Sequence, residues 1–359
     1  MRPTHIAAMA ALTAALTTMM AAAGATPGAA VHGADTAAWA DRGRLRVVEW
    51  NVENLFDTLH DAGKRDEEFL PTAARRWTSG RYWRKLTDIA RVIATLCADG
   101  RGMVDMVGLC EVENDSVMHT LTRRSPLREL GYEYVMTRSD DERGIDVALM
   151  YNPFRFRLLS HESVRVASRD HGLRPTRDLL YARGLVFTRA GLDTLHVIVA
   201  HLPSRAGGPA GDRNRRLAAA RLWELVDSIQ GRRPRADAGR GASMAADMSR
   251  LAAPKRIIVM GDFNAGADDA VFAGAPLRLT DDAGARGTYC YRGFWQWLDH
   301  VLVSDGVEPS GAAMVVRLPW LVEENRSYGG DMPRRTFRGP TYHGGVSDHL
   351  PLAIEVWLR

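Results

Sequence analysis

The chain has 359 residues, a formal charge of +4 at neutral pH and three cysteines. An odd and small number of cysteines excludes a fold built on disulfides, and a chain of this length can bury ample core without them. The basic balance, with a pI of about 9.1, favours an anionic substrate.

Residues 1–30 have the pattern of a secretory signal peptide. A weakly basic start precedes an apolar stretch from Ile6 to Ala23, and small residues at 28–30 offer a cleavage site. We therefore predict export to the periplasm or the extracellular medium. An Ala-rich leader and an N-terminal anchor are the alternative interpretations. No later segment stays apolar for long enough to span a bilayer, so we expect no stable membrane insertion.

One domain is expected over residues 44–359, after a short linker at 31–43. Apolar, β-branched runs predict strands near 45–50, 104–110, 132–137, 145–151, 155–160, 183–189, 194–200, 256–261, 298–303 and 352–357. Helical periodicity predicts helices at 82–96, 115–123 and 213–230. A stretch rich in Arg, Ala and Gly predicts a loop insertion near 231–254. Many strands with few helices between them favour an α/β sandwich, in which two sheets pack face to face with helices outside.

Polar side chains stand where the predicted strands end or begin. They are Asn51, Glu53, Glu111, His201, Asp262, Asn264, Asp299, His300, Asp348 and His349. A core needs none of them, because carboxylates without partners are almost never buried. Their recurrence predicts one polar site assembled from distant segments.

Basic residues crowd two segments of the chain. The first holds Arg65, Arg75, Arg76, Arg81, Arg84 and Lys85, and the second holds Arg205, Arg213, Arg215, Arg216 and Arg221. Both segments follow proposed site residues, so they could attract an anionic substrate. Ordinary solvated helix faces explain them equally well.

Six motifs in this order carry a family resemblance. They are Trp50-Asn51-Val52-Glu53-Asn54-Leu55-Phe56-Asp57, Cys110-Glu111-Val112-Glu113-Asn114, Ala200-His201-Leu202-Pro203-Ser204-Arg205, Gly261-Asp262-Phe263-Asn264, Leu298-Asp299-His300 and Ser347-Asp348-His349-Leu350-Pro351. Together they resemble the endonuclease/exonuclease/phosphatase superfamily. The resemblance covers 44–359 and implies a four-layer α/β sandwich like that of deoxyribonuclease I, with two mixed β-sheets flanked by helices. It also implies metal-dependent hydrolysis of phosphate esters. We expect the protein to be a monomer.

The metal set follows from this chemistry and from the resemblance. Hard divalent cations take oxygen ligands, so a carboxylate and an amide suit Mg²⁺ or Mn²⁺. Glu111 is the expected ligand, Asn51 supports it, and Asp348 adds an oxygen nearby. A structural Ca²⁺ is a further expectation. A strand-end carboxylate for Glu111 and an Asx turn for Asn51 are the alternatives.

The resemblance also implies roles for the catalytic residues. Asp262 would activate water and Asn264 would orient the phosphate, if the strand continues and points both the same way; a plain Asp-x-Asn turn is the alternative. Asp299 would hold the ring of His349, which acts as general base or as a cation that stabilises the transition state. His201 would serve the leaving oxygen or bind phosphate, unless it is a structural core histidine.

Weaker candidates could contact the substrate. The position of Asp146 matches a family strand that supplies a phosphate-contacting residue, and Arg143 and Arg205 could bind the substrate. A turn arginine and a strand-start aspartate would look the same. We expect His300 to be a neighbour of the site, and Glu53 and Glu113 to be supporting residues.

Three functions compete at this point. An exported nuclease that cleaves DNA or RNA is favoured by the basic segments and the signal peptide. A phosphodiesterase or phosphatase for lipid headgroups or small molecules is the alternative, and a sphingomyelinase-like enzyme would need an exposed aromatic hairpin. The cluster Phe294-Trp295-Gln296-Trp297 is the one candidate, and we expect it to pack as a strand beside the site. A non-catalytic binding module would lack catalytic groups that this chain retains.

Overall fold

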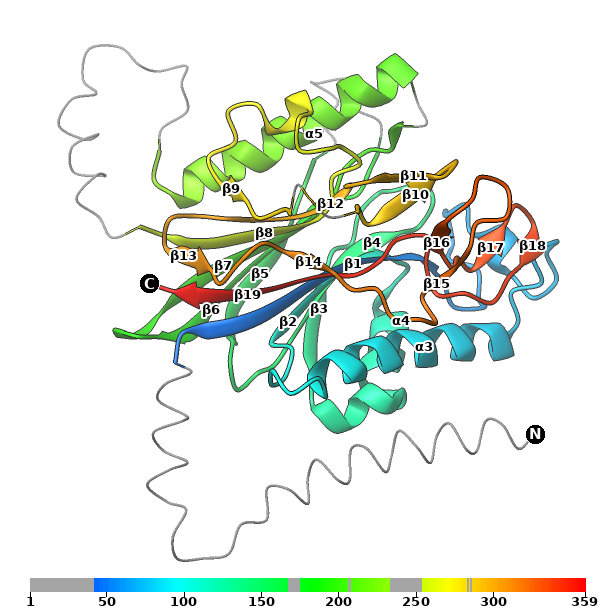
Figure 1. The fold of residues 1–359 in the computed structure, drawn as a ribbon, viewed down its shortest axis with the longest axis horizontal. Helices are drawn as coiled ribbons and strands as arrows, with labels where there is room; N and C mark the ends of the chain where they lie inside the picture. Colours follow the sequence, from blue (N-terminus) through cyan, green and yellow to red (C-terminus); the bar gives the residue numbers. More distant parts are fainter. Residues whose placement is uncertain (1–41, 167–174, 206–207, 233–253, 283, 285) are drawn as a thin grey trace, which may run out of the picture.

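The computed structural model describes residues 42–166, 175–205, 208–232, 254–282, 284 and 286–359. The predicted signal peptide at 1–30 and most of the predicted linker and loop insertion lie outside the described residues. Two large sheets and a few helices make up the described part (Figure 1). This arrangement confirms the predicted α/β sandwich.

Sheet A has the strand order β13-β19-β1-β2-β4-β3, with β14 beside β19. Its strands are β13 (Val307–Pro309), β19 (Leu352–Leu358), β1 (Arg44–Leu55), β2 (Met106–Val112), β4 (Asp146–Tyr151), β3 (Glu133–Met136) and β14 (Met314–Val315). The pair β1–β2 is parallel and its neighbours are antiparallel, so the sheet is mixed.

Sheet B has the strand order β5-β6-β7-β8-β12-β9. Its strands are β5 (Arg157–Val164), β6 (Leu179–Thr188), β7 (Gly191–His201), β8 (Arg256–Asp262), β12 (Asp299–Val303) and β9 (Arg278–Leu279). Here β7–β8 is the parallel pair. Small two-stranded pairs add β10 (Tyr289–Tyr291) with β11 (Phe294–Gln296), β15 (Val322–Glu324) with β16 (Asp331–Pro333), and β17 (Phe337–Arg338) with β18 (Thr341–Tyr342).

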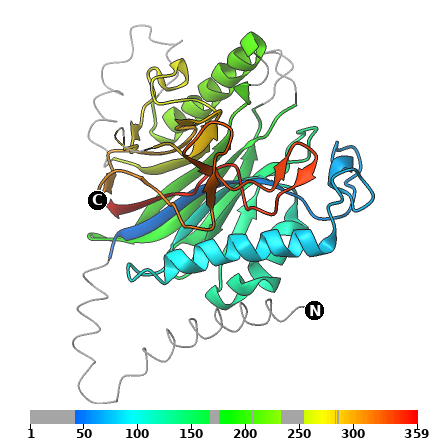
Figure 2. The same ribbon diagram turned by 45° about the vertical axis from the view of Figure 1, so that its right-hand side comes forward.

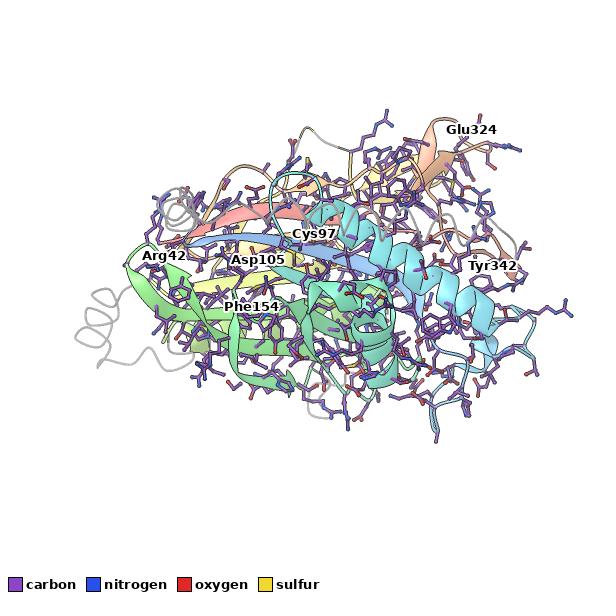
Figure 3. All side chains as sticks on the ribbon, turned by 90° about the horizontal axis from the view of Figure 1, so that it is seen from below. Arg42, Cys97, Asp105, Phe154, Glu324 and Tyr342 are labelled. Carbon is purple, nitrogen blue, oxygen red and sulfur yellow. The ribbon has the colours of Figure 1, made fainter. Side chains whose placement is uncertain are left out.

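Helices cover the outer faces of the two sheets (Figure 2). Helix α3 (Ser79–Cys97) packs on sheet A and runs along it from the loops near Tyr342 (Figure 3). Helix α5 (Gly208–Ile229) packs on sheet B with the 3-10 turn η7 (Ala270–Phe272). Shorter turns complete the set: η1 (Glu67–Phe69), α4 (Asp115–His119), the π-helical η2 (Thr120–Arg124) and η3 (Pro126–Leu130). No helix in the described part of the chain is long and apolar enough to cross a membrane.

Three apolar clusters explain this layering. One lies between the sheets and includes Val47, Met260 and Val301. The other two lie under α3 and under α5. Because side chains alternate along a strand, one strand supplies two clusters: Val47 of β1 faces sheet B and Val48 faces α3. The three thiols, Cys97, Cys110 and Cys290, are free.

The structure also differs from the sequence prediction in local detail. The segment 322–346, which looks irregular in sequence, holds the four short strands β15–β18. The predicted helix at 213–230 begins earlier, at Gly208, where Pro209 suits a first turn that has no partner for its N–H. Lys85, grouped by sequence with the basic residues, is buried in α3 and donates hydrogen bonds to the Glu53 carbonyl and the Thr336 hydroxyl.

Gly261 offers a test of the contact between β7 and β8. Its φ is +150°, and an added Cβ would lie 1.8 Å from the Ala200 carbonyl oxygen. We expect Gly261→Ala to lower the free energy of unfolding by at least about 2 kcal/mol, because the Ala200 carbonyl cannot move away from the added methyl group without distorting the backbone. Urea denaturation measures this. As the control, Gly80→Ala in α3 meets nothing within 4 Å and should unfold at the same or a slightly higher urea concentration. Equal midpoints for Gly261→Ala and the wild type would contradict the packing described.

Candidate active site

The alternation of the strands places four of the predicted residues on the inner faces of the sandwich. In β7, β8 and β12, the side chains of Val199, Met260 and Val301 point between the sheets. His201, Asp262 and Asp299 have the same parity at the ends of these strands, and all are buried. The strand register sets them side by side, with Asp262 opposite both His201 and Asp299. Asn51 of β1 reaches this row from sheet A, because it shares the parity of Val47.

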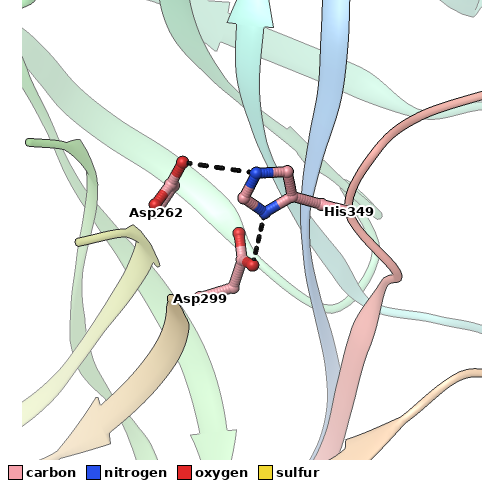
Figure 4. A group of neighbouring side chains, drawn as sticks. All are labelled: Asp262, Asp299 and His349. Atoms are coloured by element: carbon pink, nitrogen blue, oxygen red, sulfur yellow. Dashed lines mark hydrogen bonds and ion pairs between the residues drawn. The ribbon is translucent and has the colours of Figure 1, made fainter. Parts of the chain in front are cut away.

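Asp262, Asp299 and His349 form the centre of the site (Figure 4). The Nδ1 atom of His349 is 2.7 Å from an Asp299 oxygen, and its Nε2 atom is 3.9 Å from an Asp262 oxygen. The Thr288 hydroxyl also donates to the Asp299 carboxylate. The ring of His349 is therefore oriented by one carboxylate while its other nitrogen faces the second.

The loop that carries His349 is held on sheet A. The His349 amide donates to the Ser347 hydroxyl at 3.0 Å, and that hydroxyl donates to the Asn51 carbonyl at 2.6 Å. The indole of Trp50 donates to the His349 carbonyl at 3.0 Å. The Tyr289 ring lies 4.9 Å from the imidazole, centre to centre. These contacts fix the loop because β1 is fully enclosed in sheet A.

Asp262 and Asn264 come together through a turn and not along a strand. Strand β8 ends at Asp262, and Asn264 has a φ of +51°. One Asp262 oxygen accepts a hydrogen bond from the Asn264 backbone N–H at 2.8 Å. The other accepts one from the Asn51 side-chain amide at 3.0 Å. The Asn264 side chain donates to the Leu202 carbonyl at 3.1 Å. Strand β8 therefore does not continue to Asn264, and the alternative Asp-x-Asn turn is present.

Glu111 approaches the site through a β-bulge. The pairing of β2 shifts register beside it, and its φ of +66° turns the side chain out of the regular strand. One of its oxygens accepts the Asn54 amide at 2.8 Å and lies 3.6 Å from the Arg143 guanidinium. The other lies 4.0 Å from Nε2 of His201, which is itself 3.6 Å from Asp262. Glu111, His201 and Asp262 therefore share one polar space.

Two predicted residues have their main contacts elsewhere. Asp348 pairs with Arg335 at 2.8 Å, and Arg335 also lies 3.4 Å from Glu53. Asp146 accepts the Thr137 hydroxyl at 2.6 Å and the Ser139 amide at 3.1 Å, so it holds the loop before β4. The structure does not bring the Asp146 carboxylate to the centre of the site.

The two predicted arginines lie at the rim. Arg205 donates to the Asn264 carbonyl at 2.8 Å, and Arg143 donates to the Asn54 side chain at 2.7 Å. Both side chains are largely exposed at these contacts, so their remaining N–H groups can meet an anion. His300 faces the other side of β12 and pairs with Asp281 at 2.6 Å, which confirms that it is only a neighbour.

Sequence reasoning missed Glu49, which lies behind the site. It is fully buried in β1, near Cys110, and one of its oxygens has no hydrogen-bond partner among the described residues. It has the same parity as Asn51, and that signal could have placed it on the inner face. Burial, and then Asp299 and Asp262, raise the pKa of Glu49 well above its ordinary value. Burial and these two charges therefore favour the protonated form of Glu49.

Burial and neighbouring charges set the protonation of the site. Burial alone lowers the pKa of His349, but Asp299 and Asp262 outweigh it and raise that pKa well above its ordinary value. Burial, followed by the charge of Asp299, raises the pKa of Asp262 to about 7. Burial, and then Arg177 and Arg143, lower the pKa of His201 well below its ordinary value. The neighbouring carboxylates thus favour the protonated form of His349, and burial favours the neutral form of His201.

The site offers atoms to a cation. Ligand atoms of Asp262, Asp299 and His349 lie within 4.8 Å of one another. However, the hydrogen bond between His349 and Asp299 already uses an atom of each. Glu111 and Asn51 supply oxygens alone, which is the donor type that hard divalent cations take.

Comparison with known proteins identifies the family. The family model described as endonuclease/exonuclease/phosphatase family matches residues 46–357. The chain belongs to this family. The match thus places the chain among phosphoesterases, whose members are typically dependent on divalent metals. No curated protein matches the chain.

Solved structures of the same family share the fold. The human Nocturnin catalytic domain with bound sulfate is 18% identical, with 89% of this chain and 96% of that chain covered and a TM-score of 0.50. A humanized TDP2 from D. rerio is 15% identical, with 88% and 99% covered and a TM-score of 0.52. A mannosyl-6-phosphatase from Bacteroides thetaiotaomicron is 14% identical, with 87% and 99% covered and a TM-score of 0.52. At these identities the similarity shows the fold and no shared substrate.

Asp299→Asn tests the pairing with His349. The substitution keeps the shape of the side chain and removes the charge that raises the pKa of His349, so this pKa should fall. Turnover of a phosphodiester should drop by roughly 10²- to 10⁴-fold, because the ring loses its orientation and its charge. NMR titration of the metal-free protein measures the pKa. As a matched control, Asp281→Asn breaks the similar pair with His300 and should leave the His349 pKa in place. An unmoved His349 pKa in Asp299→Asn would contradict the pairing.

Proposed function

We propose that this protein is an exported nuclease that hydrolyses phosphodiester bonds of DNA, RNA or both with Mg²⁺ or Mn²⁺. The observation that carries the proposal is the buried row of His201, Asp262 and Asp299 facing His349, beside the Glu111 carboxylate. This arrangement combines a base, a cation and an oxygen ligand around one space. These are the groups that water attack on a phosphate requires.

The donor set fits a hard divalent cation. Glu111 and Asn51 would hold it, and Glu111 is positioned at the bulge where its carboxylate leaves the strand. Among the described residues, the Asn51 side-chain oxygen accepts the Glu53 backbone amide alone, at 2.9 Å, so a lone pair remains. Asp348 stays a predicted additional ligand, although it pairs with Arg335 here. When bound, the metal neutralises charge on the non-bridging phosphate oxygens.

Asp262 is the residue best suited to take the proton of the attacking water. Its pKa of about 7 matches the pH at which such a base works, and two amide donors hold its carboxylate in place. His349, whose protonated form is favoured by Asp299, would then stabilise negative charge on the phosphate through its Nε2–H. We therefore assign Asp262 as general base and His349 as the electrostatic partner.

Arginines around the opening support nucleic acid as the substrate. Arg143, Arg205 and Arg335 lie next to Glu111, Asn264 and Asp348 respectively. Contacts of this type to phosphates dominate the affinity of proteins for nucleic acids. The helical basic residues contribute less than the sequence suggests, because Lys85 and Arg215 are buried.

A lipid-headgroup phosphodiesterase is the second candidate, and one observation favours it. The aromatic cluster does not pack wholly as a core strand: β10 and β11 form a separate hairpin, with Phe294 75% and Tyr291 51% exposed. The expectation of strand packing is wrong for Phe294. An exposed aromatic hairpin beside the site is what a membrane-acting relative would need.

A substrate screen separates these functions. With Mg²⁺ or Mn²⁺, we expect the purified protein to degrade plasmid DNA or RNA, as followed on gels, and to lose activity in EDTA. Sphingomyelin, phosphatidylcholine and small phosphomonoesters should be poor substrates, because they lack the neighbouring phosphates that the rim arginines can bind. Intact nucleic acid together with rapid hydrolysis of a lipid or a sugar phosphate would replace the nuclease by the second candidate or by a phosphatase.

Two single variants test the site itself. His349→Ala and Glu111→Ala should each reduce turnover by about 10²-fold or more, because each removes a group that acts on the charged phosphate. Steady-state kinetics on a labelled oligonucleotide provide the measurement, and circular dichroism checks the fold. His161→Ala and Glu162→Ala, on the exposed face of β5, are matched controls that should retain full activity. Near-wild-type rates for either site variant would place the active site elsewhere.

A further inference from the structure

A pocket of about 330 Å³ opens beside the catalytic histidine. Tyr289 connects the two, because its ring lies 4.9 Å from the His349 imidazole and also lines the pocket. Arg335, the partner of Asp348, lines the same pocket. A group attached to a phosphate at His349 could therefore enter this pocket directly.

Aromatic rings line the pocket on two sides. Tyr291 at the end of β10 is 51% exposed, and Tyr328 in the loop between β15 and β16 is 60% exposed. Exposed tyrosine rings in a concave site offer flat apolar faces to a ligand. A planar group is the ligand that gains most from such faces.

The charge of the lining is positive. It includes Arg292, Arg335 and Arg338, and none of the described lining residues is a carboxylate. Arg335 and Arg338 pair with acids outside the lining, with Asp348 and Glu323. Arg292 stacks over the Tyr291 ring at 5.2 Å, and no ion pair of Arg292 occurs among the described residues. Its charge is thus available to an anion near the mouth of the pocket.

A second pocket, near Arg205, has the opposite character. It measures about 640 Å³ and contains four aspartates, Asp212, Asp268, Asp269 and Asp281. The lining also includes Arg205 and Arg215, but its aspartates outnumber them, so it suits an anionic aromatic ligand less well than the first pocket does. The two directions in which a substrate can extend from the site therefore differ in the charge of the pocket that it would enter.

The pocket is held together by a tight packing contact. The hairpin β10–β11 turns at Arg292-Gly293 with φ values of +50° and +86°. A Cβ on Gly293 would lie 2.8 Å from that of Tyr328, so the glycine lets the hairpin touch the β15–β16 loop. In Figure 1 this hairpin and β15–β18 lie together at one end of the sandwich.

We propose that this pocket binds the nucleobase next to the scissile phosphate, stacked on Tyr291 and Tyr328, with Arg292 at a neighbouring phosphate. This inference rests on the proposed nuclease function. A base provides the flat π face and its nucleotide provides the negative charge, whereas a sugar phosphate or lipid headgroup lacks the aromatic plane. Stacking of this kind accepts every base, so little sequence preference is expected.

Calorimetric titration of the full-length mature protein tests the pocket in EDTA, where turnover stops. AMP should bind about tenfold or more tightly than ribose 5-phosphate, as expected for one stacked base. Tyr328→Ala and Tyr291→Ala should remove this difference. Tyr328→Phe should keep it, because the ring remains, and Phe154→Ala, an exposed phenylalanine remote from the site, should also keep it.

The inference is wrong if AMP and ribose 5-phosphate bind equally to the wild type. It is equally wrong if mannose 6-phosphate binds more tightly than AMP, which would assign the rings to a sugar. Binding of sphingomyelin vesicles that depends on Tyr291 and Phe294, without preference for AMP, would assign the hairpin to a membrane.

Cys290 gives a second measurement that needs no substitution. It lines the pocket and is partly exposed, whereas Cys97 and Cys110 are buried. AMP should slow alkylation of Cys290 by iodoacetamide severalfold, and ribose 5-phosphate should not. An unchanged rate with saturating AMP would also contradict the proposal.

These results are separable from those for the nuclease. If AMP binds as expected but DNA and RNA stay intact, the pocket is a nucleotide site of a different phosphoesterase. If nucleic acid is cleaved while AMP and ribose 5-phosphate bind equally, the nuclease stands and the pocket proposal fails.

Discussion

The Asn51 amide donates a hydrogen bond to the Asp262 carboxylate at 3.0 Å, and this contact joins the two sheets at the edge where the site lies. It exists because β1 and β8 pack face to face, and both Asn51 within β1 and Asp262 at the end of β8 have inward parity. The neighbouring apolar side chains Val47 and Met260 bury the space behind it. The position of every catalytic group therefore depends on how far apart, and in what register, the two sheets are held.

Burying charged groups in this space costs free energy, and hydrogen bonds and ion pairs to these groups offset the cost. Asp299 has the His349 ring and the Thr288 hydroxyl, and Asp262 has two amide donors. Burial and the charges of Asp299 and Asp262 raise the pKa of Glu49, so its protonated form is favoured behind the site. Burial disfavours the ionised form of these groups. It thereby shifts the pKa of Asp262 into the range in which it can accept a proton.

A second network supports the site from the side of α3. Buried Lys85 binds the Glu53 carbonyl and Thr336, and the Glu53 carboxylate accepts the Thr336 amide at 2.6 Å. Arg335 then connects Glu53 to Asp348. Burial lowers the pKa of Lys85 to about 8 and, together with Asp348, raises the pKa of Glu53 to about 7. The supporting role expected of Glu53 is therefore one of positioning the loop that carries Asp348 and His349.

The sequence by itself determined which residue types stand at the strand ends. It also indicated that these residues form one site. Period-two alternation and the order of the motifs were enough for the family, the sandwich and the row of His201, Asp262 and Asp299, because parity along a strand is a local property. The tertiary structure alone decided the rest. The turn at Asn264, the bulge at Glu111, the partner of Asp348 and the contacts of Asp146 depend on backbone angles and on residues outside the motifs that folding brings together. Arg335, Thr288 and Tyr289 carry no local signal, since each acts on the site only through a partner that folding brings to it.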